Sequence, residues 1–313
     1  MATRPPPLRP ATALLPATLA GWLALAEKTY ARARLALGQT DASARDEALW
    51  LFLRTLGWPL SSDARALERP LTAGQRARLC AVLRRRAEDR VPAAYLLREA
   101  WLGGGKFYVD ERVLIPRSYF VEIIPTLPAL LPDGVKVRRA ADVCTGSGCL
   151  AILLARQFPG ATVDATDLSP GALAVARRNI RAHRLARRVR PLRADVLEII
   201  AKAAASKPSP RYDLILSNPP YEPGAVCDRL PAEFKYEPRL ALDGGRDGLD
   251  IIRKLFRQAR SSLAPHGLLL IEVGGLRRAM TREFRALKLE WLPTADGSNC
   301  VCLARAENLR TKL

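Results

Sequence analysis

The chain has 313 residues, a formal net charge of +19 and a hydrophobic content of 49%, which suits a globular protein with one large core or two modest cores. It contains no run of about 18 uncharged apolar residues, so we expect no membrane span. Six cysteines without a CxxC pair and only two histidines argue against a zinc site and favour reduced thiols in a cytosolic protein.

The N-terminal segment is basic and contains no acid among its first 26 residues. Arg4 and Arg9 lie among many Ala, Pro and Leu residues, but serine is scarce, and a transit peptide usually contains it. We therefore favour an ordinary N-terminus and a cytoplasmic location, with mitochondrial targeting as the minor alternative.

Residues 1–97 predict a small helical domain. Apolar residues at helical spacing run from about residue 17 onward. Thr72 is a suitable N-cap with Gln75 three residues later, which predicts a helix that ends near Ala87.

Residues 98–117 predict a short hairpin that links two domains. Gly103, Gly104 and Gly105 mark a tight turn, and the alternating residues from Phe107 to Val109 indicate a strand. The second domain follows over residues 118–313.

Strand and helix patterns alternate from about Arg138 onward, which predicts an α/β fold with a parallel sheet covered by helices on both faces. The expected strands are Ala140–Val143, Thr162–Ala165, Val189–Leu192, Asp213–Ser217 and Leu268–Val273. Leu287–Leu292 and Asn299–Ala304 predict a terminal antiparallel pair. The expected helices are Leu150–Gln157, Pro170–His183, Val196–Ala205, Leu249–Leu263 and Leu276–Ala286.

The most informative motif is Asn218-Pro219-Pro220-Tyr221, which follows a predicted buried strand. Two prolines cannot continue a strand or a helix, so the backbone is held in one rigid loop at the carboxyl end of the strand. The loop offers an amide, prolyl carbonyls and an aromatic ring, a set that suits a planar NH2 group. The alternative is a merely structural double-proline turn.

A glycine loop follows the first strand of the α/β region. This strand-to-helix turn is formed by Asp142, Cys144, Thr145, Gly146, Ser147 and Gly148. The glycines permit a tight turn and close approach to a ligand. Asp167 lies 19 residues after Gly148, where a carboxylate can accept both hydroxyls of a ribose. A dinucleotide site and an empty tight turn are the alternatives.

Asp195 follows the third predicted strand. An acid here can accept from an adenine amino group, with Val196 packed on the ring; equally, the acid can serve the positive end of a helix dipole. Taken together, Asp167 and Asp195 describe an adenosine site. The Asn218–Tyr221 loop then favours methyl transfer to a planar nitrogen over hydride transfer.

These motifs resemble a class I S-adenosylmethionine-dependent methyltransferase with a Rossmann-like seven-stranded sheet. More closely, Arg90–Leu96, Phe107–Arg117 and Glu237–Leu249 resemble the protein glutamine N5-methyltransferases over roughly residues 30 to 305. The sequence Cys144–Cys149 and the Ser118-Tyr119 pair after Arg117 resemble the branch that acts on large-subunit ribosomal protein three. In the release-factor branch, Pro and an acid usually follow that arginine.

The resemblance implies S-adenosylmethionine as cofactor and a protein of the translation machinery as substrate, either the ribosomal protein or a release factor. It implies that Asn218 and the Pro219 carbonyl accept from the glutamine amide while Tyr221 packs against it. Phe107, Pro116 and Arg117 would border the glutamine pocket. No metal is expected.

Two alternatives remain open. The same loop serves adenine or cytosine amino-methyltransferases, and the positive charge suits a nucleic acid, although we find no separate RNA-binding module. A non-catalytic assembly factor could also retain the fold. Eight arginines lie between Asp167 and Asp195 with no acid among them, and they represent either an rRNA-binding surface or an ordinary solvated face.

Overall fold

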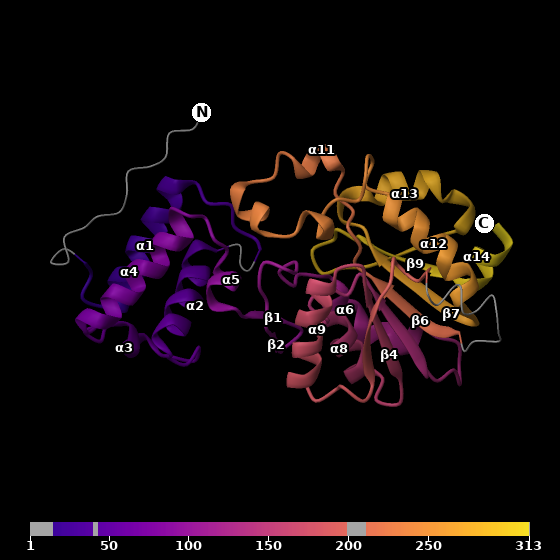
Figure 1. The fold of residues 1–313 in the computed structure, drawn as a ribbon, viewed down its shortest axis with the longest axis horizontal. Helices are drawn as coiled ribbons and strands as arrows, with labels where there is room; N and C mark the ends of the chain where they lie inside the picture. Colours follow the sequence, from indigo (N-terminus) through magenta and orange to yellow (C-terminus); the bar gives the residue numbers. More distant parts are fainter. Residues whose placement is uncertain (1–14, 40–42, 199–210, 313) are drawn as a thin grey trace. The chain divides into compact units, whose positions relative to one another are not determined.

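The computed structural model describes residues 15–39, 43–198 and 211–312 (Figure 1). These residues form two compact units. The first, called the helical unit, comprises the chain up to Ala100 together with Pro231–Tyr236. The second, called the sheet unit, comprises Trp101–Leu230 and the chain from Glu237 onward.

The helical unit contains helices α1 (Leu19–Ala33), α2 (Ala44–Leu56), α3 (Ala64–Leu67), α4 (Ala73–Ala87) and α5 (Ala93–Leu97). Trp22 and Phe52 meet edge to face in its core, with ring centroids 6.1 Å apart. The predicted start of α4 is confirmed: Thr72 and Gln75 form a reciprocal capping box, and the helix ends at Ala87.

A buried ion pair joins α2 to α4 in this unit. Arg86 Nε donates to Glu47 Oε1 at 2.7 Å, and both side chains are almost fully buried. The later segment η3 (Ala232–Tyr236) also belongs here, because Arg90 donates to the buried Glu233 at 2.6 Å and Tyr236 Oη donates to the Asp89 carbonyl at 2.6 Å.

The sheet unit begins with the predicted hairpin, formed by β1 (Ala100–Leu102) and β2 (Gly105–Phe107). Three short elements follow the next loop: α6 (Phe120–Ile123), η2 (Ile124–Thr126) and α7 (Leu127–Leu130).

The predicted seven-stranded sheet is present, in the order β5-β4-β3-β6-β7-β9-β8. Its strands are β3 (Arg139–Val143), β4 (Thr162–Asp167), β5 (Val189–Arg193), β6 (Tyr212–Ser217), β7 (Leu263–Glu272), β8 (Glu290–Leu292) and β9 (Val301–Arg305). The first five strands in this order are parallel, and β9 pairs antiparallel with both β7 and β8. The topology reverses between β3 and β6, and open α/β sheets bind ligands at such a switch point.

Helices cover both faces of this sheet because its strand residues alternate between two cores. Ala140, Val163 and Leu214 face the core under α8 (Cys149–Gln157) and α9 (Pro170–Ala182). Ala141 and Ile215 face the opposite core. That side carries α12 (Asp250–Ser262), α13 (Arg277–Glu283) and α14 (Ala306–Lys312) (Figure 1).

Some element boundaries differ from the prediction. Strand β7 begins at Leu263, five residues before the expected Leu268, because Leu263 already pairs with Tyr212 of β6, ahead of a shift in register. The helix expected over Leu276–Ala286 ends at Glu283 and is followed by η6 (Arg285–Leu287). Of the helix expected over Val196–Ala205, residues 199–205 lie outside the described part.

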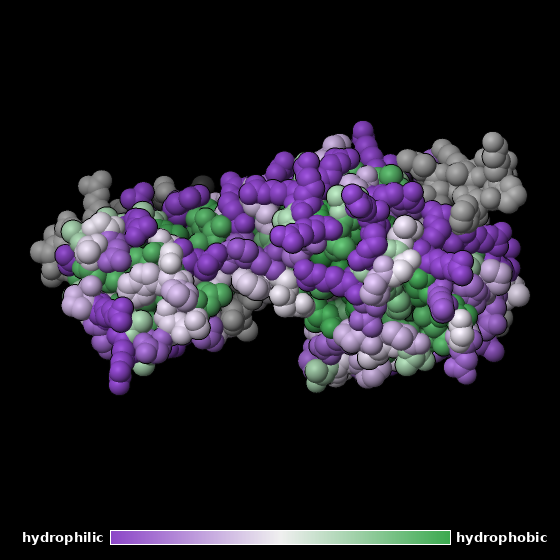
Figure 2. Space-filling view, turned by 90° about the horizontal axis from the view of Figure 1, so that it is seen from below, coloured by the Kyte–Doolittle hydropathy of each residue, from purple (hydrophilic) through white to green (hydrophobic). Residues whose placement is uncertain are grey.

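Hydrophilic side chains cover much of the molecular face in Figure 2, with apolar atoms visible between them. Within the residues that the structure describes, every helix is too short or too polar to span a bilayer.

Candidate active site

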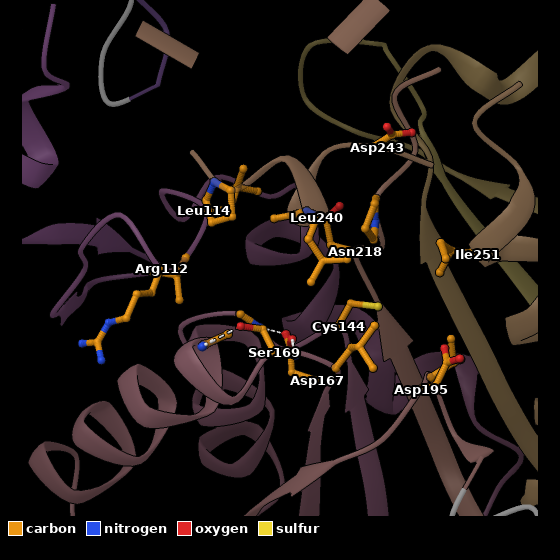
Figure 3. A pocket seen from close by; sticks show the side chains of 18 of the residues that line it. Arg112, Leu114, Cys144, Asp167, Ser169, Asp195, Asn218, Leu240, Asp243 and Ile251 are labelled. Atoms are coloured by element: carbon orange, nitrogen blue, oxygen red, sulfur yellow. Dashed lines mark hydrogen bonds between the residues drawn. The ribbon is translucent and has the colours of Figure 1, made fainter. Parts of the chain in front are cut away.

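A cavity lies at the carboxyl ends of β3, β4 and β6, at the topological switch point (Figure 3). Of the predicted residues, its wall includes Cys144, Gly146, Asp167, Asp195, Val196, Asn218 and Pro220. The segments Phe107–Arg117 and Glu237–Leu249, which carry the family resemblance, also contribute to the wall, through Arg112, Val113, Leu114, Pro238, Leu240, Ala241 and Asp243. The sequence did not single out the remaining wall residues, which are Leu168, Ser169, Ala172, Ala194 and Ile251.

The glycine loop after β3 is shaped by left-handed backbone. Gly148 has φ +80°, and a β-carbon on it would lie 3.1 Å from Ala176 Cβ, so α8 and α9 can approach closely only with glycine there. Gly146 has φ +54°, and the space where its β-carbon would be is open. Cys144 also adopts φ +61° and presents its side chain to the cavity.

Asp142, Thr145, Ser147 and Gly148 do not line the cavity. Asp142 is completely buried, and its Oδ2 accepts from Thr145 Oγ1 at 2.5 Å and from Ala151 N at 2.9 Å. Its Oδ1 has no hydrogen-bond partner, and burial raises the pKa of Asp142 to about 7. These residues therefore hold the loop against α8 and form its support.

Asp167 stands at the rim of the cavity with its carboxylate fixed. Gly146 N donates to Oδ2 at 2.9 Å. Ser169, which lies beside Asp167 in Figure 3, donates from its backbone N to Oδ1 at 2.8 Å. Burial raises the pKa of this carboxyl above its ordinary value. Each oxygen keeps a lone pair for a further donor, as a pair of ribose hydroxyls requires.

Asp195 and Val196 form the wall just after β5. Ile251 lies on the same side of the cavity as Asp195 (Figure 3). Asp195 Oδ2 accepts from Lys254 Nζ at 2.6 Å, which leaves the other oxygen for a ligand. Val196 has φ +62°, a strained conformation for a β-branched residue, and Thr166 Oγ1 donates to its carbonyl at 2.9 Å. Strain that is held in place at a cavity wall marks a functional position.

Asn218 has its side-chain NH2 turned toward protein acceptors. Nδ2 donates to Glu272 Oε1 at 3.1 Å and to the Arg117 carbonyl at 3.5 Å. Since both hydrogens are committed, the side-chain oxygen is the group that remains to accept from a ligand.

The sequence analysis missed Glu272, which lies at the end of β7. Its side chain is 3% exposed and also accepts from Ser118 Oγ at 2.5 Å and from Tyr119 N at 3.0 Å. Burial raises the pKa of Glu272 to about 7. An acid within the apolar run Leu268–Val273 was the signal that could have revealed it.

Most of the remaining Asn218–Tyr221 loop lies outside the cavity wall and is supported by packing. Pro219 is buried, whereas Pro220 reaches the cavity. Tyr221 does not line the cavity; it packs beside Gly274, where a β-carbon would lie 2.6 Å from its ring. Burial raises the pKa of Tyr221 well above its usual range.

Glycines of the segment Asp243–Gly248 allow that segment to lie directly on the loop. A β-carbon on Gly244 would lie 2.8 Å from the Pro220 carbonyl oxygen, and one on Gly248 would lie 2.3 Å from the Tyr221 carbonyl oxygen. Gly244 N also donates to the Glu222 carbonyl at 2.8 Å. The two segments therefore fix each other's shape.

Phe107, Pro116 and Arg117 lie outside the cavity wall. Phe107 is fully buried in the core and tilts against His183. Arg117 forms two hydrogen bonds to the buried Glu237, at 2.6 and 2.8 Å, so its guanidinium fastens its own segment to Glu237. The neighbouring Val113 and Leu114 line the cavity in their place.

Two family models match the chain. The methyltransferase small domain matches residues 123–233, and the PrmC N-terminal domain matches residues 28–97. With the seven-stranded sheet and the cavity at its switch point, these matches define a class I methyltransferase, whose cofactor is S-adenosylmethionine.

Curated relatives cover nearly the whole chain. Those named ribosomal protein uL3 glutamine methyltransferase include the protein of Burkholderia pseudomallei, 43% identical over 90% of this chain and 92% of its own length. The Bordetella pertussis protein is 41% identical over 89% and 92%, and that of Neisseria meningitidis serogroup B is 39% identical over 93% and 94%. The chain belongs to this family of ribosomal protein uL3 glutamine methyltransferases.

A more distant likeness exists among solved structures. The human methyltransferase 10 domain containing protein has a TM-score of 0.47 and 16% identity, over 65% of this chain and 89% of that one.

The residues of the cavity fit S-adenosylmethionine. Asp167 offers two fixed oxygens to a ribose, and Val196 and Ile251 offer apolar surface to a flat ring. The open space at Gly146 leaves the backbone accessible to the rest of the cofactor.

Proposed function

We propose that this chain transfers a methyl group from S-adenosylmethionine to the side-chain amide nitrogen, N5, of a glutamine in ribosomal protein uL3. The names of its relatives support the substrate. The observation that carries the chemistry is Asn218, whose NH2 is occupied by Glu272 and the Arg117 carbonyl and whose oxygen can therefore receive a substrate NH2.

The cofactor is held by residues of the glycine loop and the two neighbouring strand ends. Asp167 would accept from the ribose hydroxyls, Asp195 would accept from the adenine amino group, and Val196 would pack on the ring. Cys144 and Gly146 line the path between them. When bound, the cofactor supplies an electrophilic methyl group on a positively charged sulfur.

The glutamine amide nitrogen is a weak nucleophile because its lone pair is delocalised into the carbonyl. Asn218 Oδ1 and the Pro219 carbonyl accept its two N–H groups and aim the nitrogen at the methyl carbon. The nitrogen forms the new bond as the bond from the methyl carbon to sulfur breaks, and its extra proton then leaves to water. Positioning is therefore the main contribution of the protein.

Tyr221 and Arg117 support this arrangement without lining the cavity. Tyr221 fills the space beside Gly274 and keeps the two prolines in place. Arg117 ties its segment to Glu237, which keeps the Arg117 carbonyl within reach of Asn218. We assign both residues to positioning, together with Pro116, and Phe107 to the packing of the core under α8 and α9.

The protein substrate requires a larger surface than one glutamine. We assign its recognition to the helical domain of residues 1–97, joined through residues 98–117 to the catalytic domain of residues 118–313. We also place the reaction in the cytoplasm, where ribosomal proteins and release factors are available. A release factor is the alternative substrate.

The test is methyl transfer from radiolabelled S-adenosylmethionine to purified uL3, to a release factor and to rRNA, each offered separately. Asn218→Ala removes the acceptor. Asn308→Ala is the matched control, because Asn308 lies on α14 and outside the cavity wall. Mass spectrometry then identifies the modified residue.

We expect label on a glutamine of uL3, lost in Asn218→Ala and kept in Asn308→Ala. Label on the release factor instead would overturn the substrate and keep the mechanism. Label on RNA alone would overturn glutamine methylation. Undiminished label with Asn218→Ala would overturn the role of Asn218.

A further inference from the structure

A second surface of the sheet unit lies where the hairpin crosses α9. Tyr108 N donates to Asn179 Oδ1 at 2.8 Å, and Asn179 Nδ2 donates to the Tyr108 carbonyl at 2.9 Å. One turn further along α9, the ring nitrogen Nε2 of His183 lies 2.9 Å from the Lys106 carbonyl. The backbone after the hairpin turn therefore runs along the helix.

The surface along this contact between the hairpin and α9 is strongly basic. The guanidinium of Arg178 stacks on the Tyr108 ring, 3.5 Å from its centroid, and Lys106 is exposed beside it. Helix α9 itself contains no acid. Arg156 adds a further positive charge, since its Nη2 lies 2.7 Å from His183 Nδ1.

Three more arginines extend this surface along α9 and just past its end. Arg177 and Arg181 are four residues apart and neighbour one another on α9, whereas Arg184 follows the C-cap His183 with φ +59°. All three are exposed, and none forms an ion pair with a described residue. At 1.5 Å per residue Arg177 and Arg181 are about 6 Å apart along the axis of α9, and with Arg184 they offer positive charge to more than one phosphate of a nucleic acid strand.

The basic surface continues to the mouth of the cavity. Arg112 lines the cavity edge and packs on the start of α9, because a β-carbon on Gly171 would lie 3.4 Å from Arg112 Cδ. Its guanidinium points away from the cavity in Figure 3 and pairs with Asp110. Asp110 and the exposed Glu111 are the acids at this end.

Aromatic surface accompanies the arginines. Trp101, on strand β1 of the same hairpin, is 47% exposed, which is unusual for so large an apolar side chain. Arginine rows combined with exposed rings suit RNA, because phosphates pair with guanidinium groups and unpaired bases stack on rings. An acidic protein would use the arginines but would have no need of the exposed ring.

We propose that this surface, called the basic strip and formed by Lys106, Arg112, Arg177, Arg178, Arg181 and Arg184, binds the phosphate backbone of single-stranded or irregular RNA, with Trp101 as a stacking surface. RNA bound there lies beside the cavity, so uL3 can be methylated while it is associated with RNA. That consequence rests on the proposed function, whereas the RNA binding itself does not.

The test measures binding of the full chain to a short fluorescent single-stranded RNA by anisotropy at several salt concentrations, without cofactor. The variant is R177E/R181E/R184E. The matched control is R257E/R282E/R285E, which makes the same charge change at exposed arginines elsewhere in the sheet unit. Among the described residues, none of these six side chains forms a hydrogen bond or an ion pair, so neither set removes one.

We expect the strip variant to bind RNA at least tenfold more weakly than the control, with a smaller salt dependence because fewer counterions are released. Trp101→Ala should weaken binding to RNA but leave binding to heparin unchanged. Equal losses in the strip and control variants would overturn the proposal, because net charge alone would then explain the binding.

A second readout separates this proposal from the proposed function. Methyl transfer to isolated uL3 should stay near the wild-type rate in the strip variant. A matching loss of that activity, or competition by polyglutamate as strong as that by RNA, would overturn the RNA assignment in favour of a protein partner. Absence of any uL3 methylation would count against the proposed function and leave the binding result standing.

Discussion

Asn218 depends on residues that lie far from it in the sequence. An asparagine amide can face a cavity with its oxygen or with its NH2, and only the oxygen can receive a substrate NH2. Glu272 accepts one hydrogen at 3.1 Å and thereby favours the useful orientation. Ser118 and Tyr119 in turn hold Glu272.

Replacing Glu272 by Gln should reduce kcat at least tenfold while the dissociation constant of S-adenosylmethionine stays within about twofold of wild type. A glutamine amide can present either its oxygen or its NH2 to Asn218, so the orientation is no longer enforced. Steady-state methyl transfer and calorimetric cofactor binding measure the two effects. An unchanged kcat would show that Asn218 keeps its orientation without the carboxylate.

The pH dependence of kcat should report the same residue. Three donors point at Glu272, which favours its carboxylate, whereas burial raises its pKa to about 7. We expect kcat to rise with pH through about 7 in the wild type and to lose this inflection in Glu272→Gln. A profile with the same inflection in the variant would assign it to another group.

At the scale of elements, the loop after β6 and the segment Asp243–Gly248 act as one piece. Backbone hydrogen bonds join them, and glycine is required where they touch. Gly244 lies 26 residues after Asn218 in the sequence and contacts the same loop. The glycine-rich segment therefore shapes the loop, although only Asp243 of the segment reaches the cavity.

Gly248→Ala should lower stability by about 1–3 kcal/mol and activity by at least tenfold. Its β-carbon would collide with the Tyr221 carbonyl, and its φ of +82° strains any other residue. Urea unfolding and kcat measure the two losses. Gly160→Ala is the matched control, because the space around Gly160 is open; wild-type kcat in Gly248→Ala would contradict the coupling of the two segments.

At the scale of the whole sheet unit, two acids buried at the site carry raised pKa values. The pKa of Asp142 and that of Glu272 are each about 7, above their ordinary values of 3.8 and 4.5. Acids with raised folded-state pKa values stabilise the fold fully at low pH, and this contribution is lost as pH rises through 7. Asp110 and Asp247, whose pKa values fall to about 2, act in the opposite direction but only below about pH 4.

We therefore expect the unfolding free energy of the sheet unit to fall between about pH 4.5 and pH 7, by about 3 kcal/mol for each buried acid. Urea titrations over this range measure it. Asp142→Asn and Glu272→Gln should each flatten the curve, and a curve equally steep in both variants would contradict the assignment.

Much of this protein follows from local sequence. Short strand-like segments between helical patterns predict β3 to β6, and Thr72 with Gln75 fixes the start of α4, because both signals depend on neighbours in the chain. The cavity residues Asp167, Asp195 and Asn218 were also predictable, since each stands at, or within two residues of, the carboxyl end of a strand of the parallel sheet.

The tertiary structure decided the rest. The strand order brings Glu272, at the end of β7, to Asn218, at the end of β6, and no local pattern encodes that hydrogen bond. No local pattern encodes the packing of Tyr221 beside Gly274 or the pairing of Arg117 with Glu237 either. These contacts hold the side chains of Tyr221 and Arg117, both predicted site residues, outside the cavity wall. The sequence by itself determined which residues stand at strand ends, because that depends on local periodicity. Only the tertiary structure decided how the side chains of these residues are oriented, because hydrogen-bond partners from distant segments compete for each donor and acceptor.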